Sequence, residues 1–557
     1  MFPRAKSNGK YDYLQIVENR RVRGKTRQQV IASLGRLDKL TESGKLDDLT
    51  RALGRLCKKV HVIDAHREGD IEANTVRKIG PALVFDRLWR ALGIDKVLHG
   101  LLFKRKFGFA VERAVFLTVL HRVFVSGSDR QAHQWRDDYV IDGVEGLELH
   151  HMYRAMAWMG EQLPESAQWA ATPFSPRCTK DLIEEALFTR RRDLFSTLDV
   201  VFFDTTSIYF EGQGGDKLGR RGNTKDHRPD LKQMIVGVVL DGQGRPVCCE
   251  MWPGNTTDVT TLLPILERLR SRFSIGTVCI VADRGMISKS TIKRLESADD
   301  LTYILGVRMR NLKEVRTKVL NRGGRYHEVY PKSKDPKAPA PLKVKEILVN
   351  IDQDDPEGGT RRYIVCHNVN QAKKDRADRQ AIVASLEDQL KHGDKQLVGN
   401  KGYRKYIKTQ GGRFTIDENK IESEARYDGK WVLRTNTELS AEDVALKYKQ
   451  LWMVEQLFRT TKSILETRPI WHKRDETIRG HVFCTFLALV LKTELYERLE
   501  RKGRDFEWND IRRDLEALQE AELTIDDETY FLRTQLRGTC HDVLRAANVA
   551  IPPTLHQ

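Results

Sequence analysis

Five short apolar segments between residues 200 and 307 constrain the fold of this chain more than any other feature. They are Val200–Asp204, Met234–Leu240, Pro246–Met251, Val278–Ala282 and Tyr303–Val307. Short, nearly continuous apolar runs are typical of strands buried on both faces. The turn Asp241–Gly244 joins the second and third segments into a hairpin, and helical patterns at Asp258–Arg270 and from Ser288 separate the later ones. This order predicts a mixed α/β sheet that opens with an antiparallel meander.

Charge and composition narrow the classes of function. The chain has 95 Lys and Arg residues against 78 Asp and Glu residues, a formal net charge of +17. A basic field concentrates polyanions, so we expect a nucleic-acid partner. No apolar stretch approaches the roughly 18 residues of a membrane span, and the N-terminus lacks the apolar run of a secretory signal. The eight cysteines contain no Cys-x-x-Cys pair, which favours a reduced, cytoplasmic protein over a disulfide scaffold.

The regions around the apolar strands differ in character. Helical spacing of apolar residues dominates before residue 195, whereas residues 311–436 are rich in Lys, Arg, Gly and Pro and contain short strand patterns and one helix, Lys373–Lys391. That length is too great for a simple loop. We therefore predict a basic N-terminal region (1–65), a helical DNA-binding domain (66–195), a sheet core in two parts (196–310 and 437–500), a mainly β insertion (311–436) and a C-terminal helical region (501–557).

Two aspartates follow apolar strands. Asp204 closes the first segment and Asp283 closes the fourth. Strand ends are where a parallel or mixed sheet presents ligand-binding groups, so the carboxylates converge if these strands are neighbours. Two such anions repel each other, and Mg²⁺, which prefers carboxylate, water and phosphate oxygens, relieves the repulsion. The alternative is that each aspartate only caps a helix or forms a turn.

A third candidate carboxylate lies on a predicted helix far along the chain. Tyr448, Glu455 and Lys462 are spaced seven residues apart, so they lie on nearly one face, bordered by Arg459. A carboxylate flanked by a hydroxyl and cations suits a metal ion beside a scissile phosphate. The alternative is a solvated helix face on which Glu455 and Arg459 form an i,i+4 ion pair.

Asp204, Asp283 and Glu455 in these contexts resemble the DDE triad of cut-and-paste transposases, whose catalytic core is ribonuclease-H-like. The helix resembles the Tyr-x2-Arg-x3-Glu-x6-Lys signature of the insertion-sequence-four superfamily, except that Leu451 stands in place of the arginine. The run Asp283–Met286 resembles the second-aspartate motif of that family. The resemblance spans residues 196–490 and implies a multidomain α/β protein: a ribonuclease-H-like mixed sheet interrupted by a mainly β insertion, with helical N-terminal and C-terminal regions.

The resemblance also implies a chemistry. Asp204, Asp283 and Glu455 are expected to hold two Mg²⁺ ions, with Mn²⁺ as a substitute, for the cleavage and joining of DNA. The expected DNA contacts are Tyr448, Lys462, Arg459, Lys449, Arg284 and Trp431. Trp431 is expected to stack on an extruded base, with core packing as its alternative role. The expected partners are double-stranded DNA, as inverted-repeat ends and as target, and a second copy of the chain, in the cytoplasm of a prokaryote at the nucleoid.

Two other functions remain open from the sequence. The first is a nuclease with the same core that hydrolyses DNA without strand transfer. The second is a non-catalytic DNA-binding repressor derived from a transposase. An ATP site is excluded, because Gly24-Lys25-Thr26 lacks the glycine that a phosphate-binding loop needs at position 19, where the chain has Asn19.

Overall fold

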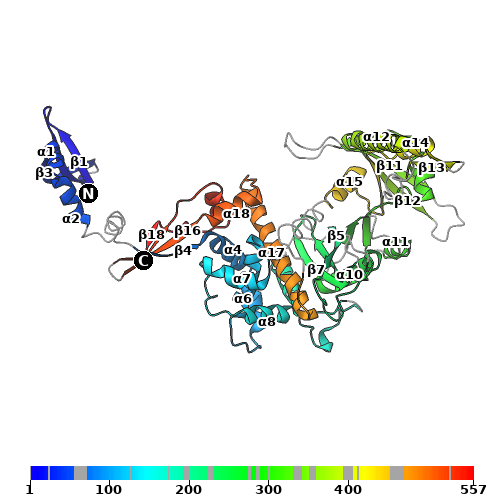
Figure 1. Cartoon of the computed structure of the whole chain (residues 1–557), viewed down its shortest axis with the longest axis horizontal. Coiled ribbons are helices and arrows are strands. Elements are labelled where there is room, and N and C mark those ends of the chain that lie inside the picture. The colour runs from blue at the N-terminus through cyan, green and yellow to red at the C-terminus, as the bar shows by residue number, and fades with distance from the viewer. Residues whose placement is uncertain are drawn as a thin grey trace. The chain divides into compact units, whose positions relative to one another are not determined.

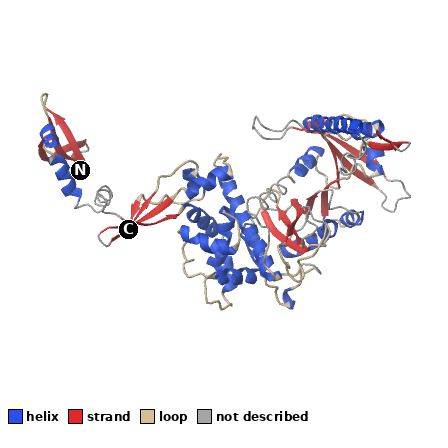
Figure 2. Cartoon of the chain, in the orientation of Figure 1, coloured by secondary structure: helices blue, strands red, loops and turns tan. Residues whose placement is uncertain are grey.

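The structure, a computed structural model, describes residues 2–22, 25–54, 72–125, 127–172, 175–191, 200–222, 230–273, 278–283, 289–298, 301–329, 342–350, 359–392, 405–410, 413–451, 470–525 and 528–557. The chain, coloured from its N-terminus to its C-terminus in Figure 1, divides into two compact units by its internal contacts. The first contains residues Met1–Pro81, Asp137–Val140 and Phe506–Gln557, and the second contains Ala82–Arg136 and Ile141–Asp505. Both units combine helices and strands (Figure 2), so the chain is a multidomain α/β protein.

The first unit contains two antiparallel sheets. One consists of β1 (Phe2–Ser7), β2 (Asp12–Val22) and β3 (Lys25–Arg36), followed by the helices α1 (Leu37–Glu42) and α2 (Lys45–Gly54). The other has the order β18-β17-β16-β4 and is formed by β4 (Glu72–Lys78), β16 (Gln519–Ile525), β17 (Glu528–Arg533) and β18 (Leu555–His556). The region after residue 501 thus contains β16, β17 and β18 in addition to the expected helices, α18 (Trp508–Glu516) and α19 (Cys540–Ala546).

The second unit begins with the expected helices, α4 (Gly80–Ala91), α5 (Ile94–Leu102), α6 (Val111–Phe124), α7 (Asp129–Trp135), α8 (Leu149–Met159) and α9 (Thr179–Arg191). Every residue of α6 except Arg113 is buried, as in a helix that other elements enclose. The long helix α17 (Asp475–Arg501) packs against α6 and α8. The approach to α8 requires a glycine, because a Cβ atom at Gly480 would lie 2.0 Å from the carbonyl oxygen of Met156. Among the described helices, none combines the length and apolarity that a bilayer crossing requires.

A nine-stranded sheet crosses the second unit in the order β10-β11-β12-β15-β9-β8-β5-β6-β7. The five strands predicted from apolar runs are β5 (Val200–Tyr209), β6 (Gln233–Leu240), β7 (Pro246–Pro253), β8 (Val278–Ala282) and β9 (Leu301–Gly306). β5, β6 and β7 are antiparallel neighbours, whereas β8 pairs in parallel with both β5 and β9. This arrangement confirms the mixed sheet with an opening meander, the ribonuclease-H-like core that the resemblance implied.

Two helices provide the crossovers that parallel strands require. α10 (Asp258–Phe273) connects β7 to β8, and α11 (Lys289–Glu296) connects β8 to β9. Leu262, Leu266 and Leu269 of α10 are buried in one apolar cluster with Ile280 and Tyr303 of the sheet. The 3.6-residue spacing of the leucines therefore covers one face of the sheet and stabilises the parallel strands.

The region predicted as an insertion extends the central sheet. Its strands β10 (His327–Val329), β11 (Leu342–Asn350), β12 (Thr360–Asn368) and β15 (Lys430–Thr435) are antiparallel neighbours. β15 then pairs with β9, where Leu433 is opposite Gly306. The rest of the region consists of the helices α12 (Val369–His392) and α14 (Glu418–Ala425) and a hairpin of β13 (Ile407–Gln410) and β14 (Arg413–Ile416). The helix predicted over Lys373–Lys391 is confirmed as part of α12.

A buried group of ionised side chains, here called the charge cluster, attaches α9 to α10 and β7. It consists of Arg177, Lys180, Arg268, Arg272, Asp181, Glu184, Glu185 and Glu250. Arg272 contacts Asp181 at 3.1 Å and Glu184 at 2.6 Å. Burial alone would raise the pKa of Asp181, but the charges of Arg272, Lys180 and Arg268 hold that pKa below its ordinary value. Each acid of the cluster thus lies against at least one cation, although burial still raises the pKa of Glu184.

Candidate functional site

β5 and β8 place the positions of Asp204 and Asp283 side by side. The parallel register pairs Phe203 with Ala282, and each aspartate is the residue that follows. Neighbouring strands in a sheet lie about 4.8 Å apart. The first and fourth apolar strands are therefore neighbours in the backbone, which is the condition for the two carboxylates to converge.

The prediction that Asp204 closes its strand is wrong. β5 continues to Tyr209, because its antiparallel ladder with β6 runs on from Asp204–Val238 to Tyr209–Gln233. The polar run after Asp204 resembles a turn in the sequence, yet Thr205, Thr206 and Ser207 are buried in the sheet. What ends near Asp204 is the parallel ladder with β8. Asp283, by contrast, directly follows the last residue of β8, as predicted.

Tyr448 connects the second aspartate to the helix that was predicted to carry the third carboxylate. It lies in the last turn of α15 (Ala441–Lys449), whose first turn is capped by the side chain of Ser440. The Tyr448 hydroxyl donates a hydrogen bond to Oδ1 of Asp283 across 3.0 Å. α15 also packs against β8 and β9, so the helix is held on the edge of the sheet where Asp283 emerges. The sequence did not indicate this hydrogen bond.

Other predicted residues lie around α15 or outside the described part of the chain. Lys449 is half-buried, and burial lowers the pKa of its ammonium group. Leu451, which stands in place of the signature arginine, is buried and offers no polar contact. Glu455, Arg459, Lys462 and Arg284 lie outside the described residues.

The chain returns to β5 immediately after the segment that contains Glu455. The backbone N–H of Ile470 donates to the carbonyl oxygen of Tyr209 at 3.4 Å, and the N–H of Glu211 donates to the carbonyl oxygen of Ile470 at 3.1 Å. Phe210 and Ile470 form a parallel β-bridge. The two flanks of residues 452–469 are therefore attached to the two strands that carry the aspartates, at Asp283 on one side and at the end of β5 on the other.

A cavity of about 540 Å³ opens beside this site, and its lining includes Asp283, Tyr448 and Trp431. Trp431 lies on β15 and is half-buried. Its indole Nε1 is buried and has no hydrogen-bond partner within the described part of the chain. A buried indole usually finds an acceptor, and none of the described residues supplies one here. The structure thus brings Trp431, which lies far from Asp283 in sequence, to the same cavity.

Basic residues that the sequence did not single out also line the cavity. Arg310 follows β9 and donates to Glu424 at 2.8 Å, and Arg379 of α12 donates to Asp428 at 2.7 Å. Lys430 donates to the backbone oxygen of Arg426. The run Arg308-Met309-Arg310 comes just after an apolar strand that is parallel to β8. This position in the sequence could have identified Arg310 as a site residue, because parallel strands end at the same edge of a sheet.

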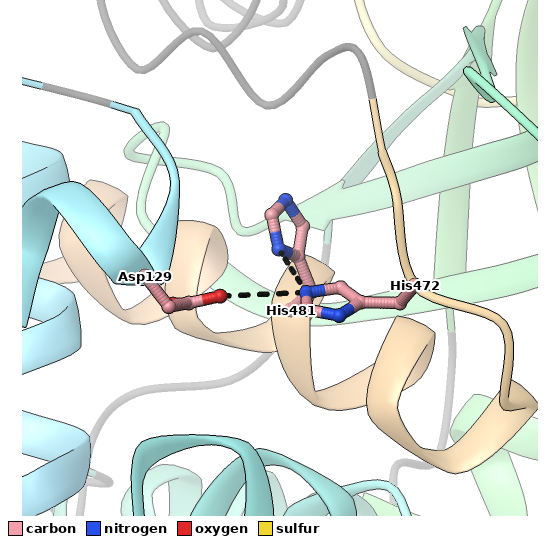
Figure 3. A group of neighbouring side chains, drawn as sticks. All are labelled: Asp129, His472 and His481. Atoms are coloured by element: carbon pink, nitrogen blue, oxygen red, sulfur yellow. Dashed lines mark hydrogen bonds and ion pairs between the residues drawn. The ribbon is translucent and has the colours of Figure 1, made fainter. Parts of the chain in front are cut away.

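A second polar group in the same unit consists of Asp129, His472 and His481, whose ligand atoms lie within 4.8 Å of one another (Figure 3). His472 Nε2 lies 3.4 Å from Asp129 and 3.1 Å from Nδ1 of His481. The guanidinium of Arg122 already contacts both Nδ1 of His481, at 2.9 Å, and Asp129, at 3.4 Å. Burial would raise the pKa of Asp129, but the His472 hydrogen bond and Arg122 hold it below its ordinary value. The guanidinium of Arg122 thus occupies lone pairs of Asp129 and of His481 that a metal ion would need. The group is therefore an ion-pair cluster.

Comparison with protein families agrees with the fold. The family model described as the transposase DDE domain matches residues 196–491, more than half of the chain. The chain therefore belongs to the DDE transposases, enzymes that act on DNA and use divalent metal ions. A second model, described as the N-terminal domain of IS1634 family transposases, matches residues 3–66 and indicates an insertion-sequence transposase. No curated protein matches the chain. The narrower resemblance to the insertion-sequence-four superfamily stays a prediction.

Proposed function

We propose that this transposase binds the inverted-repeat ends of an insertion sequence, cleaves them by metal-dependent hydrolysis and joins the 3′ ends to target DNA. One observation carries the proposal. Asp204 and Asp283 are the residues that directly follow Phe203 and Ala282, the last in-register pair of two parallel strands, inside the segment that the DDE model matches. Two strand-borne acids at one edge of a sheet form the start of an oxygen-ligand site for a hard divalent cation.

The path of the chain supports Glu455 as the third carboxylate. Its segment leaves α15 just after Tyr448, which is bonded to Asp283. The segment ends at Ile470, which is bonded to the end of β5. The described flanks of this segment thus begin beside Asp283 and end on β5, the strand that contains Asp204, which supports Glu455 as the third carboxylate.

The donor set fits Mg²⁺, with Mn²⁺ as a substitute. Asp283 supplies hard oxygen ligands, and its hydrogen-bond partner among the described residues is the neutral hydroxyl of Tyr448 rather than a cation. Asp204, Asp283 and Glu455 would together hold two ions, which supply an activated nucleophile and stabilise the leaving oxygen in an in-line displacement. Tyr448 donates to one oxygen of Asp283 and leaves the remaining lone pairs of the carboxylate for ligation. We therefore assign Tyr448 to positioning Asp283 in place of the phosphate contact expected from the sequence.

The remaining predicted residues would contact the DNA itself. Lys449, Arg459, Lys462 and Arg284 are the proposed contacts to phosphate oxygens near the cleavage point. Trp431 is the proposed stacking platform for a base, supported by its position on the cavity wall. Stacking of a base on an aromatic side chain is worth about 1–3 kcal/mol.

The helical region supports a role in DNA binding through one exposed loop. After α5, the loop presents Phe103, which is 87% exposed, followed by the exposed cations Lys104, Arg105 and Lys106. Arg105 forms an ion pair with Glu161. Exposed cations beside an aromatic ring suit a phosphate backbone, which agrees with the prediction of a DNA-binding domain over residues 66–195.

Cleavage of DNA that carries the inverted repeats bracketing the encoding gene tests the proposal. With Mg²⁺, the purified chain is expected to cut at the ends, and Asp283→Asn is expected to reduce the rate by at least about a thousandfold, since it removes a charged metal ligand but keeps the shape and the acceptor for Tyr448. Asp241→Asn is the matched control, because Asp241 also follows a strand but only caps a turn, accepting from the N–H groups of Gln243 and Arg245. Undiminished cleavage by Asp283→Asn would contradict the assignment.

The same assay separates the alternatives. A supercoiled target plasmid is expected to yield strand-transfer products, whereas a nuclease would leave only cleaved ends. A repressor would bind the ends with no divalent metal able to support cleavage. Joining two ends requires two active sites, so we propose a dimer on paired ends. Light scattering of the DNA-bound protein checks this, and a monomer would contradict it.

A further inference from the structure

The end of the hairpin formed by β2 and β3 projects beyond the rest of its sheet. β1 pairs with β2 only from Ser7–Asp12 to Phe2–Val17. The pairing of β2 with β3 continues past this point, from Glu18–Gln29 through Arg20–Arg27 to Val22–Lys25. Residues 18–22 and 25–29 therefore form a two-stranded segment, here called the β2–β3 ribbon, which adds about 17 Å at 3.4 Å per residue.

The ribbon carries a charge pattern that its own fold does not favour. Arg20 lies directly opposite Arg27, and like charges in directly opposed positions destabilise a strand pair. Glu18 accepts from Arg20 at 3.0 Å but leaves Arg27 uncompensated among the described residues. A two-stranded ribbon is marginally stable in water even without such repulsion. A polyanion bound at the ribbon would remove the repulsion.

Charge is also unevenly distributed within this part of the chain. Residues 1–36, which form the three strands, contain nine Lys and Arg residues and two acidic residues, whereas residues 37–54, which form α1 and α2, contain three basic and four acidic residues. The positive potential is thus confined to the strands. Asn19, Arg20, Arg27, Gln28 and Gln29 are all exposed at the ribbon.

We propose that the β2–β3 ribbon enters the major groove of the transposon end and reads its bases. The major groove admits a two-stranded ribbon, and Arg pairs with guanine while Asn and Gln pair with adenine. Arg20 and Arg27 are the proposed guanine readers and Gln29 is the proposed adenine reader, because the register places these three side chains on one face of the ribbon, whereas Asn19 lies opposite Gln28 on the other face. Gln28 accepts from Arg4 at 2.6 Å, so it braces the ribbon. Duplex RNA does not fit, because its major groove is too deep and narrow for side chains to read.

This inference rests on the proposed function, and binding without divalent metal tests it separately from catalysis. Fluorescence anisotropy would compare a duplex of the element's end with a scrambled duplex of equal composition over a range of salt concentrations. Gln29→Ala is expected to lower the preference for the end duplex by about tenfold or more, with the salt dependence unchanged. Arg27→Ala is expected to lower the same preference by about tenfold or more, because it removes a bidentate contact to guanine.

Lys45→Ala is the matched control, because it removes an exposed cation from α2 of the same region and is expected to leave the preference unchanged. Circular dichroism would verify that each variant folds. Full preference for the end duplex in Gln29→Ala or in Arg27→Ala would overturn base reading by the ribbon and leave the transposase assignment intact. A wild-type chain that binds both duplexes equally would overturn both.

Discussion

The charge cluster between α9 and α10 and the carboxylate of Asp283 show two different uses of acidic residues within one unit. In the charge cluster, the guanidinium of Arg272 contacts both Asp181 and Glu184, so buried acids and bases compensate one another. At the edge of the sheet, Asp283 receives a hydrogen bond from the neutral hydroxyl of Tyr448 and faces a cavity. In the first arrangement every acid has a cationic partner, whereas in the second no cation among the described residues pairs with the carboxylate, so a bound cation can neutralise it.

The difference teaches which acids to regard as functional. A carboxylate saturated by arginines stabilises the fold and has no free lone pair for a metal ion. A carboxylate that is oriented by a neutral donor keeps its charge for a ligand. The cluster of Asp129, His472 and His481 belongs to the first kind, because Arg122 contacts it. Removing a partner should therefore alter stability in the first arrangement and metal-dependent activity in the second.

The largest effect on stability is expected from Arg272→Met. This change leaves Asp181 and Glu184 with fewer cations in a buried site, and breaking a buried pair in this way costs about 3–5 kcal/mol in the free energy of unfolding. Urea denaturation would measure it. Arg294→Met is the control, since Arg294 pairs with Glu267 at the surface, where both side chains are more than 60% exposed, and is expected to cost less than about 1 kcal/mol. Equal losses in the two variants would contradict the comparison.

A pH-dependent loss of stability is expected from His121, a buried group that lacks compensation. Burial lowers the pKa of His121 to about 4 from its ordinary 6.5. The unfolded chain therefore binds a proton below pH 6.5 that the folded chain does not bind until about pH 4. The contribution to stability is complete above pH 6.5 and falls by about 3 kcal/mol as the pH drops through this window.

Denaturation curves between pH 7 and pH 4 would measure this slope, and His121→Gln is expected to flatten it because glutamine does not titrate. His541→Gln, at an exposed histidine, is expected to leave the slope close to that of the wild-type chain. A slope that His121→Gln does not change would show that other groups dominate the acid sensitivity of the fold.

The smallest effect is expected from Tyr448→Phe, which removes the hydrogen bond to Asp283 and keeps the ring. Loss of a group that orients a metal ligand typically costs 10–100-fold in metal affinity or activity. The Mg²⁺ concentration for half-maximal cleavage is therefore expected to rise by about tenfold or more, with little change in stability. Tyr406→Phe, at another tyrosine of the same cavity, is the control. An unchanged Mg²⁺ requirement would refute the positioning role of Tyr448.

Much of the core and of the candidate site could be predicted from local patterns. The apolar runs around Val201 and Ile280 identified β5 and β8, and the aspartates that follow these runs identified the edge of the sheet. The predicted end of β5 was wrong, because Thr205 and Thr206 are polar but are held in the sheet by pairing with β6. The prediction for residues 311–436 was incomplete, because no local pattern in the sequence shows that Leu433 pairs with Gly306.

The sequence by itself determined which segments form strands and helices, where the acidic and basic residues lie, and which family pattern they match. These properties depend on the spacing of side chains along a short stretch of chain. Only the tertiary structure decided that Phe203 pairs with Ala282, that Tyr448 donates to Asp283, and that Arg272 is surrounded by acids. Such contacts join residues far apart in the chain, and they form because the packing and pairing of the whole unit outweigh the entropy lost in bringing distant segments together.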